Sequence, residues 1–194
     1  MTRIALIALG VLLALGVLVS VLPVNNKEAL GDVRLEGVNL ELYPAADSDA
    51  KWLFKASSVQ YSPETRESQV KLEGIGRRLV NGKEDLEIKA EELVIDGNDN
   101  LRTKYAQVYI PRGCWTVDLR STNPTAQEVV IDQNSGFRSP QATVSGPNFE
   151  SKGGPLDAAF NLSDPDARYN LQNPDDSFVQ GGTERCAKGK LLKE

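Results

Sequence analysis

Apolar and polar side chains alternate along most of the chain after residue 30, a period of two that is typical of β-strands with one buried face. In residues 38–42 and 86–88 every second side chain is apolar and its neighbours are polar or charged. Turn-forming pairs such as Asn81-Gly82 separate these runs, and no convincing stretch after the first 25 residues has the three- and four-residue apolar spacing of a helix. Many short strands joined by turns predict an all-β sandwich, roll or barrel.

The alternation assigns one set of apolar side chains to the inward face of the predicted strands. The set consists of Val38, Leu40, Leu42, Trp52, Phe54, Val59, Tyr61, Val70, Leu72, Leu86, Ile88, Leu93, Ile95, Val129 and Ile131. An apolar sheet face has to be covered, so we expect two such faces to pack against each other. The interior between them is either filled by these side chains or open along one side as a groove, and the pattern alone leaves both possibilities open.

Residues 4–24 form an uncharged apolar run that differs from the rest of the chain. About 20 helical residues span about 30 Å, the thickness of the hydrocarbon core of a bilayer, so residues 1–25 are predicted to be a transmembrane anchor. A cleaved signal peptide is the alternative, but its apolar region is usually about 7–15 residues long and ends at a small-x-small site. Arg3 precedes the run, which favours a cytoplasmic N-terminus and places the remaining chain outside.

Three segments share the pattern x-Ala-x-x-apolar-x-apolar. Their alanines are Ala56, Ala90 and Ala126, which are 34 and 36 residues apart. Self-similarity at about 20–50 residues is typical of stacked repeats, in which a small side chain lets the next layer approach closely. Chance similarity between short strands is the alternative interpretation, and both interpretations predict β structure.

Composition excludes several classes of function. The chain has no histidine, so catalysis that needs a histidine base or a histidine metal ligand is excluded, and no nucleophile or metal cluster stands out. The net charge of −5 disfavours nucleic-acid binding, which needs a basic surface. No phosphate-binding loop is present, so any ATP would be hydrolysed by a partner. We therefore expect no enzyme activity, no cofactor and no metal.

The chain contains two cysteines, Cys114 and Cys186. An exported protein can keep a disulfide, so we expect these two residues to be bonded; two separate thiols are the alternative. Residues 163–194 are rich in Asp, Asn, Pro and Gly and are predicted to be an irregular tail. The disulfide would hold this tail against the strand that contains Trp115.

Several segments in order along residues 1–135 carry a resemblance to a known family. After the N-terminal apolar run come residues 37–43 (GVNLELY), 52–56 (WLFKA), 59–61 (VQY), 70–74 (VKLEG) and 88–96 (IKAEELVID). They resemble the LptC family, the membrane-anchored periplasmic bridge component of the lipopolysaccharide transport system, and more broadly the OstA-like folds. The resemblance implies a bent two-sheet β-jelly roll (a β-taco) of stacked antiparallel strands over residues 26–162, preceded by one transmembrane helix.

The resemblance also implies a function. The chain would sit in the inner membrane with its bulk in the periplasm and pass lipopolysaccharide or a related envelope lipid towards the outer membrane. Its partners would be an inner-membrane ABC transporter complex and a soluble periplasmic OstA-like protein, and the inward apolar set above would line the lipid groove. A structural envelope module of the same fold, which binds another envelope protein and carries no lipid, is the alternative.

Overall fold

The computed structural model describes residues 33–180 and 182–193, which belong to the compact unit Asp32–Glu194. All of the regular structure in these residues is β-strand, and a single antiparallel 16-stranded sheet contains every strand except the hairpin β17 (Arg185–Ala187) and β18 (Lys190–Leu192). The sheet is not closed, because its path ends at two different strands, β15 and β16. The predicted all-β class and antiparallel strands are thus confirmed for the described residues.

The long strand β2 (Ala50–Ser62) is the branch point of the sheet. Its first residues, 50–53, pair with β4, whereas residues 56–62 pair with β3, and the register shifts between Ala56 and Ser58. Strand β1 (Val33–Leu42) pairs with β2 along nearly its whole length. Two arms of the sheet therefore start from the same strand.

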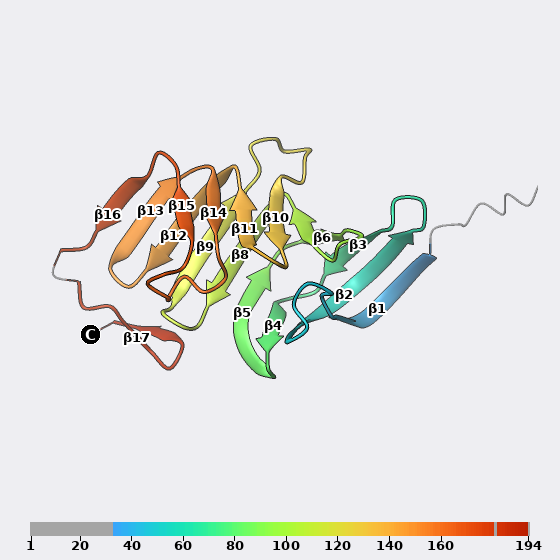
Figure 1. The fold of residues 1–194 in the computed structure, drawn as a ribbon, viewed down its shortest axis with the longest axis horizontal. Coiled ribbons are helices and arrows are strands. Elements are labelled where there is room, and N and C mark those ends of the chain that lie inside the picture. The colour runs from blue at the N-terminus through green and yellow to red at the C-terminus, as the bar shows by residue number, and fades with distance from the viewer. Residues whose placement is uncertain (1–32, 181, 194) are drawn as a thin grey trace, which may run out of the picture. The chain divides into compact units, whose positions relative to one another are not determined.

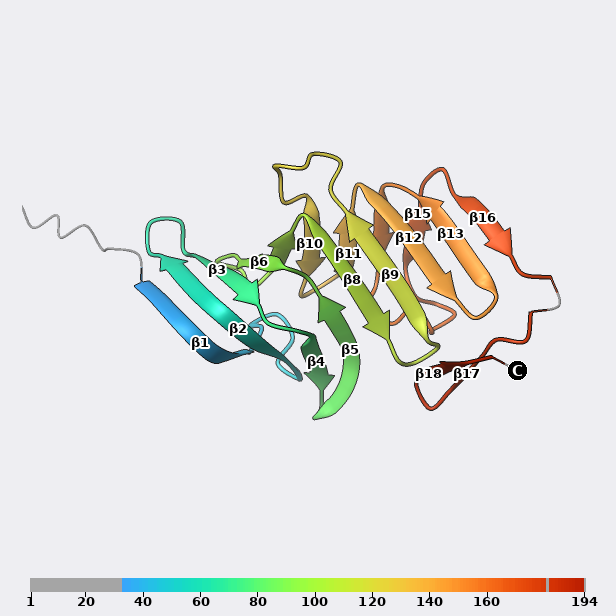
Figure 2. The same ribbon diagram turned by 180° about the vertical axis from the view of Figure 1, so that it is seen from behind.

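We call the two branches arm A and arm B. Arm A contains β3 (Glu67–Leu72), β6 (Glu92–Ile95), β7 (Leu101–Thr103), β10 (Val129–Asp132), β11 (Gly136–Ser139), β14 (Leu156–Ala158) and β15 (Tyr169–Leu171). Arm B contains β4 (Gly76–Val80), β5 (Lys83–Lys89), β8 (Tyr105–Ile110), β9 (Trp115–Arg120), β12 (Gln141–Gly146), β13 (Phe149–Gly153) and β16 (Asp175–Phe178). In both views the two arms lie one in front of the other (Figures 1 and 2).

Consecutive hairpins alternate between the arms: β4–β5 belongs to arm B, β6–β7 to arm A, β8–β9 to arm B and β10–β11 to arm A. The alanine repeat follows this alternation. Ala56 lies at the branch in β2, while Ala90 and Ala126 lie in the crossovers that lead into β6 and β10. One repeat therefore corresponds to one hairpin in each arm, and its alanine marks the point where the chain enters arm A.

The core lies between the arms and draws side chains from both. Fully or almost fully buried rows run across arm A through Val59, Val70, Leu93, Val129 and Leu156, and across arm B through Ile88, Val108, Val117 and Val144. Buried hydroxyl groups occupy the crossover end of two arm A strands. Thr103 Oγ1 lies 2.7 Å from the carbonyl oxygen of Glu92, and Ser139 Oγ lies 2.7 Å from that of Gln141. Each hydroxyl thus forms a hydrogen bond to a backbone carbonyl oxygen at the end of its strand, where the hydrogen bonds between neighbouring strands stop.

The segment from residue 163 onward differs from the expectation of an irregular tail. It adds β15 to arm A and β16 to arm B and then forms the β17–β18 hairpin. Its polar composition hid these strands because pairing with an existing sheet edge is driven by backbone hydrogen bonds, which any side chain permits. The predicted membrane anchor, residues 1–25, lies outside the described residues. Within the described ranges, no helix is long and apolar enough to cross a membrane.

Candidate functional site

The structure brings almost all of the predicted inward residues into one core. Ten are buried: Trp52, Phe54, Val59, Val70, Leu86, Ile88, Leu93, Ile95, Val129 and Ile131. Four are partly buried and pack against them: Val38, Leu40, Leu42 and Leu72. Tyr61 is the exception, because it pairs with Val33 at the outer end of the sheet and is 40% exposed. Through the middle of the molecule these side chains fill the space between the arms.

The pattern missed a second set of interior residues. Leu101, Val108, Ile110, Val117, Leu119, Phe137, Val144 and Leu156 are all buried in the same core. The alternation in residues 106–110 and 117–119 carries the signal that would have found several of them. Phe137 and Leu156 lie in strands of three or four residues, which are too short to show a period.

An apolar cavity of about 330 Å³ lies beyond the filled core, between the last strands of the two arms. Trp115, Val144 and Phe149 line it from arm B, and Tyr169 lines it from β15 of arm A. The remaining lining residues belong to the long β14–β15 loop and are Leu162, Asp164, Pro165 and Ala167. This size and apolar lining are typical of a site for a small hydrophobic ligand or part of a larger one.

Aromatic packing shapes the arm B wall of this cavity. A Cβ atom at Gly146 would lie 2.4 Å from the indole ring of Trp115, so the glycine leaves room for that ring to cross β12. The rings of Trp115 and Phe149 are nearly perpendicular, and their centres are 6.1 Å apart. The ring centres of Phe149 and Phe178, which lies in β16, are 5.1 Å apart. Phe178 itself is 72% exposed, so the aromatic row leads from the cavity to the surface.

Two polar groups border the cavity. The carboxylate of Asp164 accepts hydrogen bonds from Asn161 Nδ2 at 3.2 Å and from the backbone N of Asp166 at 3.2 Å, so it serves to hold its own loop. Burial raises the pKa of Tyr169 above its ordinary value, and this phenol therefore stays neutral at physiological pH. The cavity consequently has an uncharged lining apart from one carboxylate that is already engaged.

Side-chain contacts close the long side of the core opposite the crossovers, where the hairpin turns of the two arms meet. Trp52 Nε1 donates to Gln133 Oε1 at 2.9 Å, and the guanidinium of Arg78 lies 4.3 Å from the ring centre of Phe160. Asp47 and Asp85 form ion pairs with this buried Arg78. We call this line of contacts the seam.

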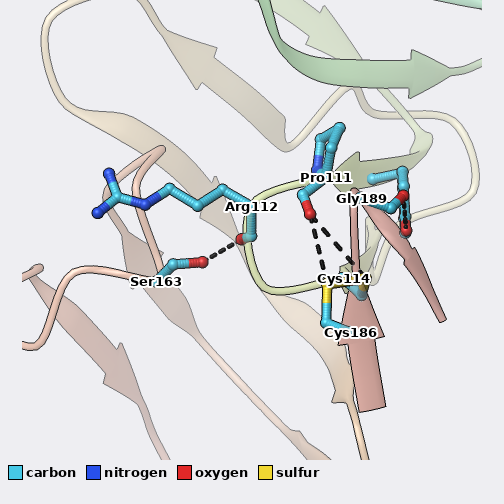
Figure 3. Close-up of a disulfide and its surroundings, with 7 residues drawn as sticks. Pro111, Arg112, Cys114, Ser163, Cys186 and Gly189 are labelled. Atoms are coloured by element: carbon cyan, nitrogen blue, oxygen red, sulfur yellow. Dashed lines mark hydrogen bonds between the residues drawn. A yellow bond between two sulfur atoms is a disulfide. The ribbon is translucent and has the colours of Figure 1, made fainter. Parts of the chain in front are cut away.

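Further contacts lie at either end of the seam. The backbone N of Ala45, in the β1–β2 turn, donates to Asp99 Oδ2 of the β6–β7 turn at 3.1 Å. At the other end Ser163 Oγ of the β14–β15 loop donates to the carbonyl oxygen of Arg112 in the β8–β9 turn (Figure 3). The interior is therefore covered along the seam and accessible at the cavity end.

The predicted disulfide between Cys114 and Cys186 is confirmed (Figure 3). It joins the β8–β9 turn to β17, and Tyr109 Oη donates to the carbonyl oxygen of Gly189 at 2.8 Å nearby. Cys114 directly precedes Trp115, so the bond fixes the backbone beside the cavity wall.

No protein-family model matches the chain, and no curated protein matches its sequence. Within residues 33–180 and 182–193, no three His, Cys, Asp or Glu side chains are grouped so that they could hold a metal ion. The candidate site is therefore defined by its geometry alone: an apolar interior that is filled in the middle and hollow at one end.

Proposed function

We propose that this chain is a membrane-anchored bridge protein of the cell envelope, which takes lipopolysaccharide or a related lipid from an inner-membrane ABC transporter complex and passes it to a soluble periplasmic OstA-like partner. The observation that carries the proposal is the apolar cavity between the arms, bordered by Trp115, Phe149 and Tyr169. Burying each methylene of an acyl chain there would contribute about 0.8 kcal/mol. In this proposal the two arms are the two sheets of a bent β-jelly roll.

The short segment between the apolar run and the sheet supports a direction for the lipid transfer. Eight residues separate Val24, the end of the apolar run, from Val33, the start of β1. Fully extended they span at most about 30 Å, so the β1 end of the sheet stays near the membrane if residues 4–24 cross it. We propose that the cavity end, which lies at the opposite end of the strand order, faces the periplasmic partner.

Apolar side chains at both ends of the sheet favour contact with further proteins. Val33 and Leu35 of β1 are each 52% exposed. At the other end Phe178, whose ring packs against Phe149 of the cavity lining, and the following residue Val179 are exposed. Edge strands with exposed apolar side chains can take up a strand from a partner. We propose that β1 serves the transporter side, and that β15 and β16 serve the soluble carrier.

A structural envelope module without lipid is the second candidate, and one observation favours it specifically. Most residues expected to line a groove are packed into a filled core, as in a protein whose interior serves stability alone. Under this alternative the cavity near Trp115 is a packing gap beneath the β14–β15 loop.

Photo-crosslinking in cells separates the two candidates. A benzophenone amino acid in place of Phe149 would face the cavity, whereas the same probe in place of Lys152, on the same strand, would face outward. A bridge protein is expected to give a lipid adduct at residue 149 and none at residue 152. Adducts only to the protein's own loop at residue 149 would leave the structural module as the function.

A further inference from the structure

The two long sides of the interior are held in different ways. On one side the chain itself crosses between the arms, for example at Lys104 and Pro140, so covalent bonds join them. On the seam side the described contacts are made by side chains of strands, turns and loops, among them the pairs Trp52–Gln133 and Arg78–Phe160. We call these two pairs the latch.

Opening the seam would leave the backbone ladders of both arms intact. Trp52 and Arg78 belong to β2 and β4 of the arm B side, whereas Gln133 and Phe160 belong to turns of arm A. None of the strand pairs of the sheet joins these two groups. The arms can therefore separate by a hinge at the crossovers and at the irregular register of β2 near Ala56.

The latch is incompletely satisfied as the structure stands. Arg78 is 4% exposed and Gln133 is 2% exposed, yet Arg78 Nε and Gln133 Nε2 have no hydrogen-bond partner. Native proteins leave few buried donors unpaired, and a buried ion pair adds little to stability compared with apolar packing. In the part of the chain that the structure describes, three buried side-chain donors lack a partner, and two of them, Arg78 Nε and Gln133 Nε2, lie in the latch; the third is Arg102 Nε. Two unpaired donors at one place indicate that this place serves more than stability.

We propose that the latch is a gate: acyl chains enter the filled part of the core when the seam opens, and oxygen atoms at the base of the acyl chain accept hydrogen bonds from Arg78 Nε and Gln133 Nε2. This inference rests on the proposed lipid-carrying function. It adds a second entry for the lipid, through the seam at the side of the molecule, besides the cavity at its end. An ester or amide carbonyl supplies the acceptor that both donors lack.

The chain's two tryptophans report on the two places separately, because Trp115 lines the cavity and Trp52 belongs to the latch. The full chain would be labelled with 5-fluorotryptophan in lipid nanodiscs, and its fluorine resonances assigned with Trp52→Phe and Trp115→Phe. Titration with dodecanoic acid is then expected to shift both resonances.

A cross-link across the seam tests whether the arms must separate. Ala45→Cys and Asp99→Cys place thiols on opposite sides of the seam, where the backbone N of residue 45 and Oδ2 of residue 99 are 3.1 Å apart. A short bis-maleimide would join them without attacking the native disulfide. The control pair, Arg77→Cys and Glu87→Cys, lies directly opposed on β4 and β5 within arm B.

The gate predicts that the seam cross-link abolishes the Trp52 shift and leaves the Trp115 shift, while the control cross-link changes neither. A Trp52 shift that persists across the locked seam, or is lost in both cross-linked chains, overturns the gate. A Trp115 shift without any Trp52 shift also overturns it and leaves the proposed function standing. If neither resonance moves, the lipid-carrying function fails together with the gate.

Discussion

At the scale of single residues, Ile88 and Lys89 show how consecutive side chains of one strand point alternately into the core and into solvent. Ile88 lies in β5 between Gly76 and Val108 of the neighbouring strands and is fully buried, whereas Lys89 points outward and is exposed. A Cβ atom at Gly76 would lie 2.9 Å from Ile88, so the fit around this side chain is tight. Removing part of it would leave a void that its neighbours cannot fill.

We expect Ile88→Ala to lower the free energy of unfolding by about 2–5 kcal/mol, because it loses buried apolar contacts and leaves a cavity. Urea denaturation followed by circular dichroism measures this difference. The matched control is Lys89→Ala on the outward face, which should change the free energy by no more than about 0.5 kcal/mol. Equal effects of the two substitutions would contradict the assignment of the faces.

Glu128 organises the long crossover between β9 and β10. Its Oε2 accepts hydrogen bonds from the backbone N of Thr122 at 2.8 Å, from Thr122 Oγ1 at 2.9 Å and from the backbone N of Asn123 at 3.1 Å. The hydrogen bond from Asn123, together with those from Thr122, lowers the pKa of this carboxyl below its ordinary 4.5. The charged form is therefore favoured in the folded state.

Glu128→Gln should lower the thermal midpoint of unfolding most clearly at neutral pH. A lowered pKa in the folded state stabilises above the ordinary value of 4.5, and this stabilisation disappears as the pH falls through the folded-state value. The difference between the two midpoints should accordingly shrink below about pH 4.5, where the wild-type carboxyl also becomes neutral. A difference that stays constant from pH 7 to pH 3 would rule out this role.

At the residue scale, the sequence predicted the inward side chains correctly where the alternation is long. It failed where an apolar residue stands alone or where the strand is short. Val70 and Leu93 were assigned inward and are fully buried. Phe149 and Tyr169 were not assigned, although they line the cavity. Phe149 has Pro147 and Ser151 two positions away, so it belongs to no apolar alternation, and Tyr169 lies in a strand of only 3 residues. Tyr61 was assigned inward but is exposed, because it lies where the covered part of the sheet ends.

At the scale of elements, the alanine repeat had a structural meaning that the sequence suggested only in part. The pattern predicted stacked units, and the structure places Ala90 and Ala126 at crossovers into arm A. The branching of β2 carries no local signal, because residues 50–62 alternate like any long strand. Which strand pairs with each half of β2 depends on contacts far away in the chain, and those contacts are not encoded by local spacing.

A disulfide joins the β17–β18 hairpin to the rest of the protein. Cys186 joins it to Cys114 of the β8–β9 turn, and the carbonyl oxygen of Gly189 accepts a hydrogen bond from Tyr109 of β8. Replacing both cysteines, Cys114→Ser with Cys186→Ser, should lower stability by about 2–4 kcal/mol by relaxing the constraint on the unfolded chain. Chemical denaturation measures the loss, and trypsin should cut faster at Lys188 and Lys190.

A reducing agent provides the control for the disulfide. It should destabilise the wild-type chain to the level of the double variant and leave the double variant unchanged. An unreduced wild-type chain that reacts with thiol reagents, or that is no more stable than the double variant, would contradict a stabilising bond between Cys114 and Cys186.

At the scale of the whole molecule, the apolar run of residues 4–24 is expected to keep the chain in the membrane after an alkaline carbonate wash, with an intact mass that includes this run. Leu13→Arg places a charge in its middle at a cost of about 2.5–3.5 kcal/mol and should release part of the protein. The control, Leu30→Arg, lies outside the run and should release none. A mature chain that begins after residue 20 would identify the run as a cleaved signal.

The sequence by itself determined the strand class and the inward face of the longer strands, because alternation is local. It also limited the cysteines to one possible bond within the chain, and the structure showed that this bond is formed. Tertiary structure alone decided that β2 divides the sheet into two arms, that Trp52 meets Gln133 across the seam, and that the space near Trp115 stays hollow. These features arise where segments distant in sequence meet, and the side chains that fill or leave a space there are set by all of the neighbours together.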